Sequence, residues 1–142
     1  MMRAPWAVAA AGIFVWLGMV IAISFMEAPL KFRAPGVTLQ LGLSIGRLVF
    51  RALNAAEVVL ALTVLVALQF DPPPSGVTAV IAIAVVVLAV QLVAVRPWLT
   101  RRSDAVLAGA QGPRSRGHYI YIALELIKTS ALLVSGILLF AA

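Results

Sequence analysis

The chain contains no cysteine and only one histidine, and these two absences restrict the chemistry that it can support. Without cysteine it has no disulfides and offers no thiolate ligands to a metal. A single histidine, His118, is too few for a zinc site of the usual histidine-rich kind. A glycine-rich phosphate loop and a helical metal-binding motif are also missing. We therefore expect no metal site, and a protein that is not an enzyme.

Charged residues are scarce as well. They make up 11% of the 142 residues, whereas hydrophobic residues make up 63%. An average soluble domain has about 25% charged residues. A soluble fold of this size cannot hide so much apolar surface from water, so part of its solvent must be lipid. The formal net charge of +6 does not indicate a nucleic-acid partner, because the basic residues lie in the gaps between apolar segments.

Four apolar segments are long enough to cross a hydrocarbon layer of about 30 Å as helices. They cover approximately residues 5–26, 50–70, 77–95 and 119–140. Helix is required because backbone amides in lipid must be satisfied within their own segment or in a closed barrel, and the alternation of a barrel strand is missing. The first segment is too long for a signal peptide and lacks a convincing cleavage site, so we interpret it as a retained helix. The sequence predicts one all-α domain, an integral membrane four-helix bundle.

Turn signals separate these segments. The run Asp71-Pro72-Pro73-Pro74 predicts a tight turn between the second and third helices. Arg96-Pro97 predicts the end of the third helix, and the Gly-, Ser- and Arg-rich residues 101–117 are expected to form the longest loop. The stretch 34–49 contains Pro35-Gly36 and mixed polarity. It predicts a short interfacial segment, or an extended first part of the second helix.

The distribution of Lys and Arg predicts the orientation. The first and third connections carry most of these residues, the second connection and the C-terminus carry none, and the N-terminus carries only Arg3. Short basic connections face the cytoplasm, so both termini are expected outside. We expect a multi-pass protein of a bacterial inner (plasma) membrane. The arginine-rich third connection is also a candidate surface for anionic lipid headgroups, although the orientation bias explains it by itself.

Polar residues within the predicted fourth helix are the first part of a candidate site. A charge at mid-membrane costs about 2.5–3.5 kcal/mol on insertion scales, so such residues are usually paired and face inward. Spacings of three and four residues place the polar side chains of this helix on one face. They are His118, Tyr121, Glu125 and Lys128.

The second helix carries a matching polar face, formed by Arg47, Arg51 and Asn54 with Glu57 on its shoulder. Because the charges of Arg51, Glu57, Glu125 and Lys128 sum to zero, we expect the second and fourth helices to pack with these faces together. The resulting buried polar cluster would lie in the cytoplasmic half of the membrane.

Further residues are expected near this cluster. Glu27 and Lys31, at the inner end of the first helix, are candidates to cover its mouth, and Gln91 lies at a compatible depth. Intramembrane charges usually mark a functional site, but paired charges can also hold helices in register without any ligand. The pair Glu125 and Lys128 can also satisfy itself within one helix. Both alternatives stay open from the sequence.

Three other features are weaker. His118 is a candidate axial ligand for haem or a pigment, but one interfacial histidine is more often a plain polar helix start. Tyr121 is either a member of a proton relay or one of the aromatic residues at the membrane interface. The spacing Gly42-x-x-x-Gly46 would allow another segment to approach the second helix closely.

Two sequence stretches resemble a known family. Val15-Trp16-Leu17-Gly18, continued by Ala28-Pro29-Leu30-Lys31-Phe32, is similar to the opening of a family of small four-helix membrane proteins. This family includes bacterial proteins of unknown function and eukaryotic relatives of transmembrane protein 205. Arg116-Gly117-His118 followed by Glu125 resembles the start of its last helix. The resemblance implies four helices and no settled substrate.

A more distant likeness extends to copper-resistance D-type membrane domains and to a haem-pathway membrane oxidase. The metal- or haem-binding histidines of those relatives have one counterpart at most, His118. Four short helices enclose little room for a solute path, so we expect a transport-associated or accessory subunit in a homo-oligomer or a larger membrane complex. The alternatives are a haem- or pigment-binding oxidoreductase-type subunit using His118, and a proton- or ion-coupled transporter using Glu57, Glu125 and Lys128.

Overall fold

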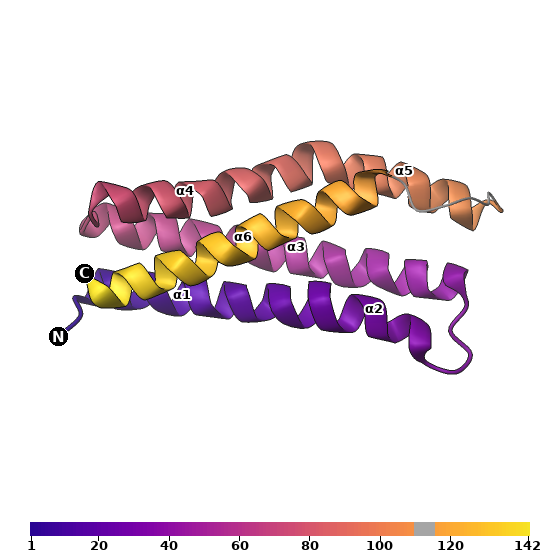
Figure 1. Ribbon diagram of the computed structural model, residues 1–142, viewed down its shortest axis with the longest axis horizontal. Helices are drawn as coiled ribbons and strands as arrows, with labels where there is room; N and C mark the ends of the chain where they lie inside the picture. Colours follow the sequence, from indigo (N-terminus) through magenta and orange to yellow (C-terminus); the bar gives the residue numbers. More distant parts are fainter. Residues whose placement is uncertain (110–115) are drawn as a thin grey trace.

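The computed structural model describes residues 1–109 and 116–142, and these residues form a bundle of helices without strands (Figure 1). Four of its helices are long and apolar enough to cross a membrane, which confirms the predicted fold class. We call them the first to fourth spans: Ala4–Arg33, Leu39–Phe70, Ser75–Leu107 and Gly117–Ala141.

Two of the spans are composite. The first consists of α1 (Ala4–Val20), the π-helix η1 (Ile21–Glu27), α2 (Ala28–Leu30) and the 3₁₀ turn η2 (Lys31–Arg33). The third consists of α4 (Ser75–Val90), the π-helix η3 (Gln91–Val95) and α5 (Arg96–Leu107). The second and fourth spans are the single helices α3 (Leu39–Phe70) and α6 (Arg116–Ala141).

The helices are longer than the sequence predicts. The second begins at Leu39, where the Thr38 hydroxyl caps it by accepting a hydrogen bond from the Leu41 amide at 3.1 Å. Most of the stretch 34–49 is therefore the first part of this helix, one of the two forms expected for it. Pro97 does not end the third helix, as the sequence predicted, because the chain continues as α5 to Leu107. The predicted loop 101–117 is thus helical at its start, and residues 110–115 lie outside the described part.

The two π-helical segments explain how prolines are accommodated inside spans. Each segment ends two residues before a proline, Pro29 in the first span and Pro97 in the third. Proline has no amide hydrogen and its ring clashes with the carbonyl one turn earlier, so a wider turn before it relieves the clash. The amide of Arg96, for example, bonds to the carbonyl of Gln91, five residues back. Segments of this kind occur frequently at functional sites.

The spans pack as two hairpins. Both termini and the turn between α3 and α4 lie at one end of the bundle, which we call the termini end, and α2 and α5 lie at the other, basic end (Figure 1). α1 packs against α3, α4 packs against α6, and α1 and α6 join the two hairpins. α3 and α6 are not close neighbours along their backbones. The second and fourth helices, which were expected to pack with their polar faces together, therefore meet through long side chains, Lys128 with Glu57 and Tyr121 with Phe50, and not by close backbone approach.

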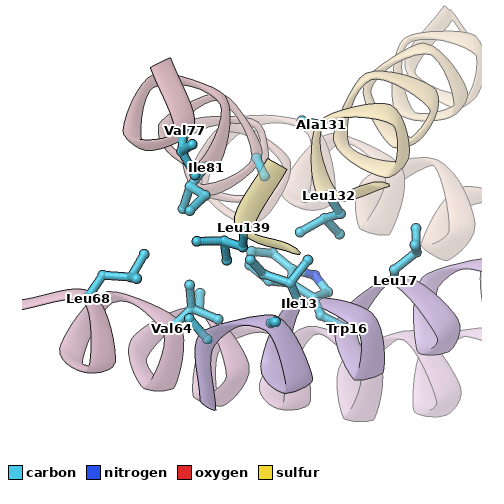
Figure 2. Close-up of a cluster of buried hydrophobic side chains, with 14 of the residues drawn as sticks. Ile13, Trp16, Leu17, Val64, Leu68, Val77, Ile81, Ala131, Leu132 and Leu139 are labelled. Carbon is cyan, nitrogen blue, oxygen red and sulfur yellow. The ribbon is translucent and has the colours of Figure 1, made fainter. Parts of the chain in front are cut away.

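The termini half of the bundle has an apolar core. Side chains from α1, α3, α4 and α6 converge there, with Ile13 and Trp16 facing Leu132 and Leu139 (Figure 2). All four of these residues are almost completely buried. At the rim of this core the Trp6 indole donates a hydrogen bond to the Asp71 carbonyl at 2.7 Å, and Arg3 pairs with the Asp71 carboxylate at 2.6 Å. These contacts tie the N-terminus to the turn between the hairpins.

Close approach at the basic end uses the two glycines that the sequence singled out. A Cβ atom added at Gly46 would lie 2.8 Å from the Lys31 Nζ atom, and one added at Gly42 would overlap the ring of Phe32. The glycine face of α3 therefore receives side chains from the end of the first span. This contact brings Lys31 back toward the bundle instead of leaving it in solvent.

The two hairpins also repeat one pattern. The interval from Pro29 to Glu57 equals the interval from Pro97 to Glu125. The same offset relates further pairs of buried residues, namely Ile13 with Ile81, Val20 with Leu88, Leu53 with Tyr121, and Val64 with Leu132. Both hairpins start at the termini end, so equivalent residues lie at similar depth (Figure 1). Glu57 and Glu125 are therefore equivalent carboxylates of two similar halves.

Candidate functional site

A cluster of buried polar side chains lies between the apolar core and the basic end, and all four spans contribute to it. The cluster has six members. Five of them, one of which is a lysine, are joined by hydrogen bonds and ion pairs, and the sixth, a serine, donates a hydrogen bond to one of the two carboxylates. The residues are Trp16 and Ser24 from the first span, Glu57 from α3, Gln91 from η3, and Glu125 and Lys128 from α6. We call this group the central cluster.

Lys128 is the hub of the central cluster. Its ammonium lies 2.5 Å from Glu57 Oε2, 2.6 Å from Glu125 Oε1 and 2.8 Å from Gln91 Oε1. An ammonium has three donors, so these contacts satisfy it completely. The Lys128 side chain is 0% exposed and bridges α6 to α3 across the bundle. The sequence predicted this meeting of charges correctly, although the bridge is made by side chains and not by direct packing of the two helices.

Glu125 is satisfied at both oxygens. Oε1 accepts from Lys128 and, at 2.9 Å, from the Gln91 amide, while Oε2 accepts from the Ser24 hydroxyl. Ser24 and Gln91 both belong to the π-helical segments of their spans. The widened turns at Pro29 and Pro97 therefore supply two of the groups that hold Glu125.

Glu57 is bound at only one of its two oxygens. Oε2 accepts from Lys128 and from the Trp16 indole at 2.8 Å. Oε1 is buried and has no hydrogen-bond partner among the described residues. The two equivalent carboxylates thus differ, because Glu125 is saturated and Glu57 keeps one acceptor atom unused.

The central cluster itself contains two carboxylates and one cation. With both carboxylates ionised, two negative charges face the positive charge of Lys128. The next cation is Arg96, which lies over the ring of Tyr121 and not within the cluster. Arg51, which was expected to complete a neutral set, is exposed and forms no part of the cluster. An isolated charge in a medium of low dielectric constant is costly unless it is paired. Within the cluster, Glu57 Oε1 is the acceptor atom that has no partner among the described residues.

A second layer closes the central cluster on the basic side. Phe50 and Tyr121 contact each other edge to face, with ring centroids 5.9 Å apart. The Arg96 guanidinium lies over both rings, 4.7 Å from the centroid of Phe50 and 5.5 Å from that of Tyr121. The Lys31 ammonium lies 5.8 Å from the Phe50 centroid and 3.6 Å from the Glu27 carboxylate. The predicted mouth residues Glu27 and Lys31 thus lie beside this aromatic layer.

Besides Arg51, the other two residues of the predicted polar face of the second helix, Arg47 and Asn54, lie outside the cluster. Arg47 forms an ion pair with Asp104 of α5 at 2.7 Å, and both side chains are partly exposed. Asn54 is half-buried and contributes no hydrogen bond to the central cluster. The face that carries Arg47 and Arg51 therefore points toward the basic surface and not toward Lys128.

His118 lies at the start of α6 and packs its ring against Tyr119, with centroids 5.7 Å apart. It is half-buried and lies outside the central cluster. Among the described residues no group of three or more His, Cys, Asp or Glu side chains is placed to hold a metal ion. The haem or pigment role of His118 stays a prediction.

Sequence reasoning missed Trp16 and Ser24 as members of the site. Trp16 stands in the stretch that carries the family resemblance, yet its indole is the donor that holds Glu57. The equal intervals from Pro29 to Glu57 and from Pro97 to Glu125 were the available signal that the two glutamates form a pair.

The serine in Gly42-Leu43-Ser44-Ile45-Gly46 has the spacing of a hydrolase nucleophile. It lies inside α3 and donates to the Gln40 carbonyl at 2.9 Å, so no nucleophile turn is formed.

No protein-family model, curated protein or solved structure matches this chain.

Proposed function

We propose that the protein is a transport-associated membrane subunit that binds and releases one cation equivalent at the central cluster. The observation that carries the proposal is the fully buried Lys128, held between two carboxylates of which only one is saturated. Burying an ionisable group inside a membrane costs free energy, and the ionisable groups found there commonly form proton or ion pathways. An unpaired negative charge provides the driving force for uptake of a cation.

The internal repeat supports the same function by analogy. Many transporters consist of repeated halves, and their ion sites lie near mid-membrane at the interface of the halves, where helices are interrupted. Here Glu57 and Glu125 come from equivalent positions of two hairpins, and π-helical interruptions lie beside them. The two halves differ in one charged residue, because the residue of the first half that is equivalent to Lys128 is the uncharged Leu60.

Purified protein in liposomes tests the proposal. A potassium diffusion potential is applied, and cation movement is followed with a trapped pH-sensitive dye and with a sodium indicator. We expect uptake in the wild type and its loss in Glu57→Gln, because that substitution replaces the ionisable carboxylate by a neutral amide and makes the cluster neutral with Glu125 and Lys128 ionised. Uptake that is unchanged in Glu57→Gln would contradict the proposal.

A matched control separates the site from carboxylates in general. Asp104→Asn removes an exposed carboxylate from the same bundle, one that pairs with Arg47 and lies outside the central cluster and its mouth. We expect this variant to retain wild-type uptake. Loss in both variants would point to a general effect on folding or insertion and would remove the support for a site at Glu57.

The cellular setting of this function is part of the proposal. The basic end carries the Lys and Arg residues that favour a cytoplasmic location, so we propose a bacterial inner membrane with both termini outside. A homo-oligomer or a larger complex would supply the substrate path that four helices have little room to enclose. The resemblance to relatives of transmembrane protein 205 is compatible with such a subunit.

A further inference from the structure

Tyr121 stands between the central cluster and the basic end. It lies one turn before Glu125 on the same face of α6, and its side chain is 7% exposed. Its hydroxyl is buried and has no hydrogen-bond partner among the described residues. A buried hydroxyl without a partner is costly, so its retention at this position calls for an explanation.

We infer that Tyr121 is a proton relay and selectivity gate, and that the cation exchanged at Glu57 is therefore a proton and not a metal ion. This inference rests on the proposed function and names its ion. It is carried by the geometry of the aromatic layer, by the unpartnered Tyr121 hydroxyl and Glu57 Oε1, and by the cations beside the layer.

The cations beside the layer oppose any positive ion that must pass through the layer as a whole, whereas a proton crosses it by transfer from one hydrogen-bonded group to the next. A metal ion that approaches from the basic end meets the half-buried Arg96 and Lys31, which lie against Phe50. Hard metal ions also need several oxygen ligands, about six to eight for calcium. Among the described residues of the cluster, the carboxylate oxygen left without a partner is Glu57 Oε1. The Tyr121 hydroxyl and Glu27 Oε2 are the other described oxygens near this path without a hydrogen-bond partner. Together the three are fewer than a hard metal ion needs, whereas one acceptor is sufficient for a proton.

The relay step conserves protons. The Tyr121 hydroxyl accepts a proton from a hydronium ion on the basic side as it passes its own proton toward the Glu57 carboxylate, so the hydronium becomes water, the hydroxyl is regenerated and one proton has moved. Each of the four spans places polar or charged groups around this path. They are Ser24, Glu27 and Lys31 from the first span, Glu57 from the second, Gln91 and Arg96 from the third, and Glu125 and Lys128 from the fourth.

The substitution Tyr121→Phe tests the inference, because it removes the hydroxyl and keeps the ring that packs on Phe50. We expect proton uptake into liposomes to fall at least tenfold, with an unchanged melting temperature. The matched control is Tyr119→Phe, which removes an exposed hydroxyl from the same helix and should retain wild-type uptake.

Each outcome has a definite meaning. Proton uptake in Tyr121→Phe equal to that of the wild type overturns the relay while leaving the proposed function intact. Wild-type uptake of sodium in place of protons overturns the assignment of the ion, but still agrees with cation binding at Glu57. Absence of both proton and sodium uptake in the wild type overturns the proposed function and this inference together.

Discussion

The two hairpins of this bundle share a pattern of buried positions but bind their carboxylates differently. In the C-terminal hairpin Glu125 accepts from Lys128, Gln91 and Ser24, and both of its oxygens are engaged. In the N-terminal hairpin Glu57 accepts from Lys128 and Trp16 through one oxygen only. The difference shows how two equivalent positions of a repeated fold come to hold one fully bonded carboxylate and one with an oxygen left unbonded, although a single lysine contacts both.

The largest expected effect comes from removing that shared lysine. Lys128→Met leaves two buried carboxylates facing each other without a cation. Breaking a buried ion pair by removing one partner costs about 3–5 kcal/mol. We expect the free energy of unfolding in detergent to fall by that amount, as measured by denaturant titration.

The triple variant Lys128→Met/Glu57→Gln/Glu125→Gln is the control for this prediction. It removes the charges together and should recover most of the lost stability, because no ion is left unpaired. A single variant as stable as the wild type would mean that Lys128 does not neutralise the carboxylates.

Smaller losses of stability are expected when the uncharged hydrogen-bond donors of the two hairpins are replaced. Gln91→Leu removes a donor to Glu125 and an acceptor from Lys128, whereas Trp16→Phe removes only one donor to Glu57. A hydrogen bond to a charged group contributes about 1.5–3 kcal/mol. We therefore expect Gln91→Leu to lower the free energy of unfolding roughly twice as much as Trp16→Phe. Equal losses would show that the two carboxylates are held alike.

The architecture could be predicted from the sequence because hydropathy and the requirement for internal hydrogen bonding leave few alternatives in lipid. The boundaries of the helices could not be predicted in the same way. Pro97 is a helix-ending signal in water, but the π-helical turn at Gln91–Val95 lets the helix continue past it. Thr38 caps a helix that begins well before Phe50, and the sequence left open whether the residues before Phe50 extend this helix or form an interfacial segment.

The site could be predicted in part, for a different physical reason. Residue spacing shows which side chains share a face of a helix, and it grouped Glu125 with Lys128 correctly. Spacing does not show which face meets the other helices. Arg47 and Arg51 were therefore placed in the cluster, while the neighbouring face with Glu57 is the one that turns inward. Trp16 and Ser24 could not be found this way, because their roles arise only from the packing of four spans.

The central claim is that the buried cluster takes up one proton because it contains one carboxylate more than its lysine can neutralise. Infrared spectroscopy of the purified protein at neutral pH tests this claim most directly, since a protonated carboxyl group has a carbonyl band distinct from that of a carboxylate. We predict such a band in the wild type and its loss in Glu57→Gln. A wild-type spectrum without this band, in protein that retains its fold, would contradict the claim.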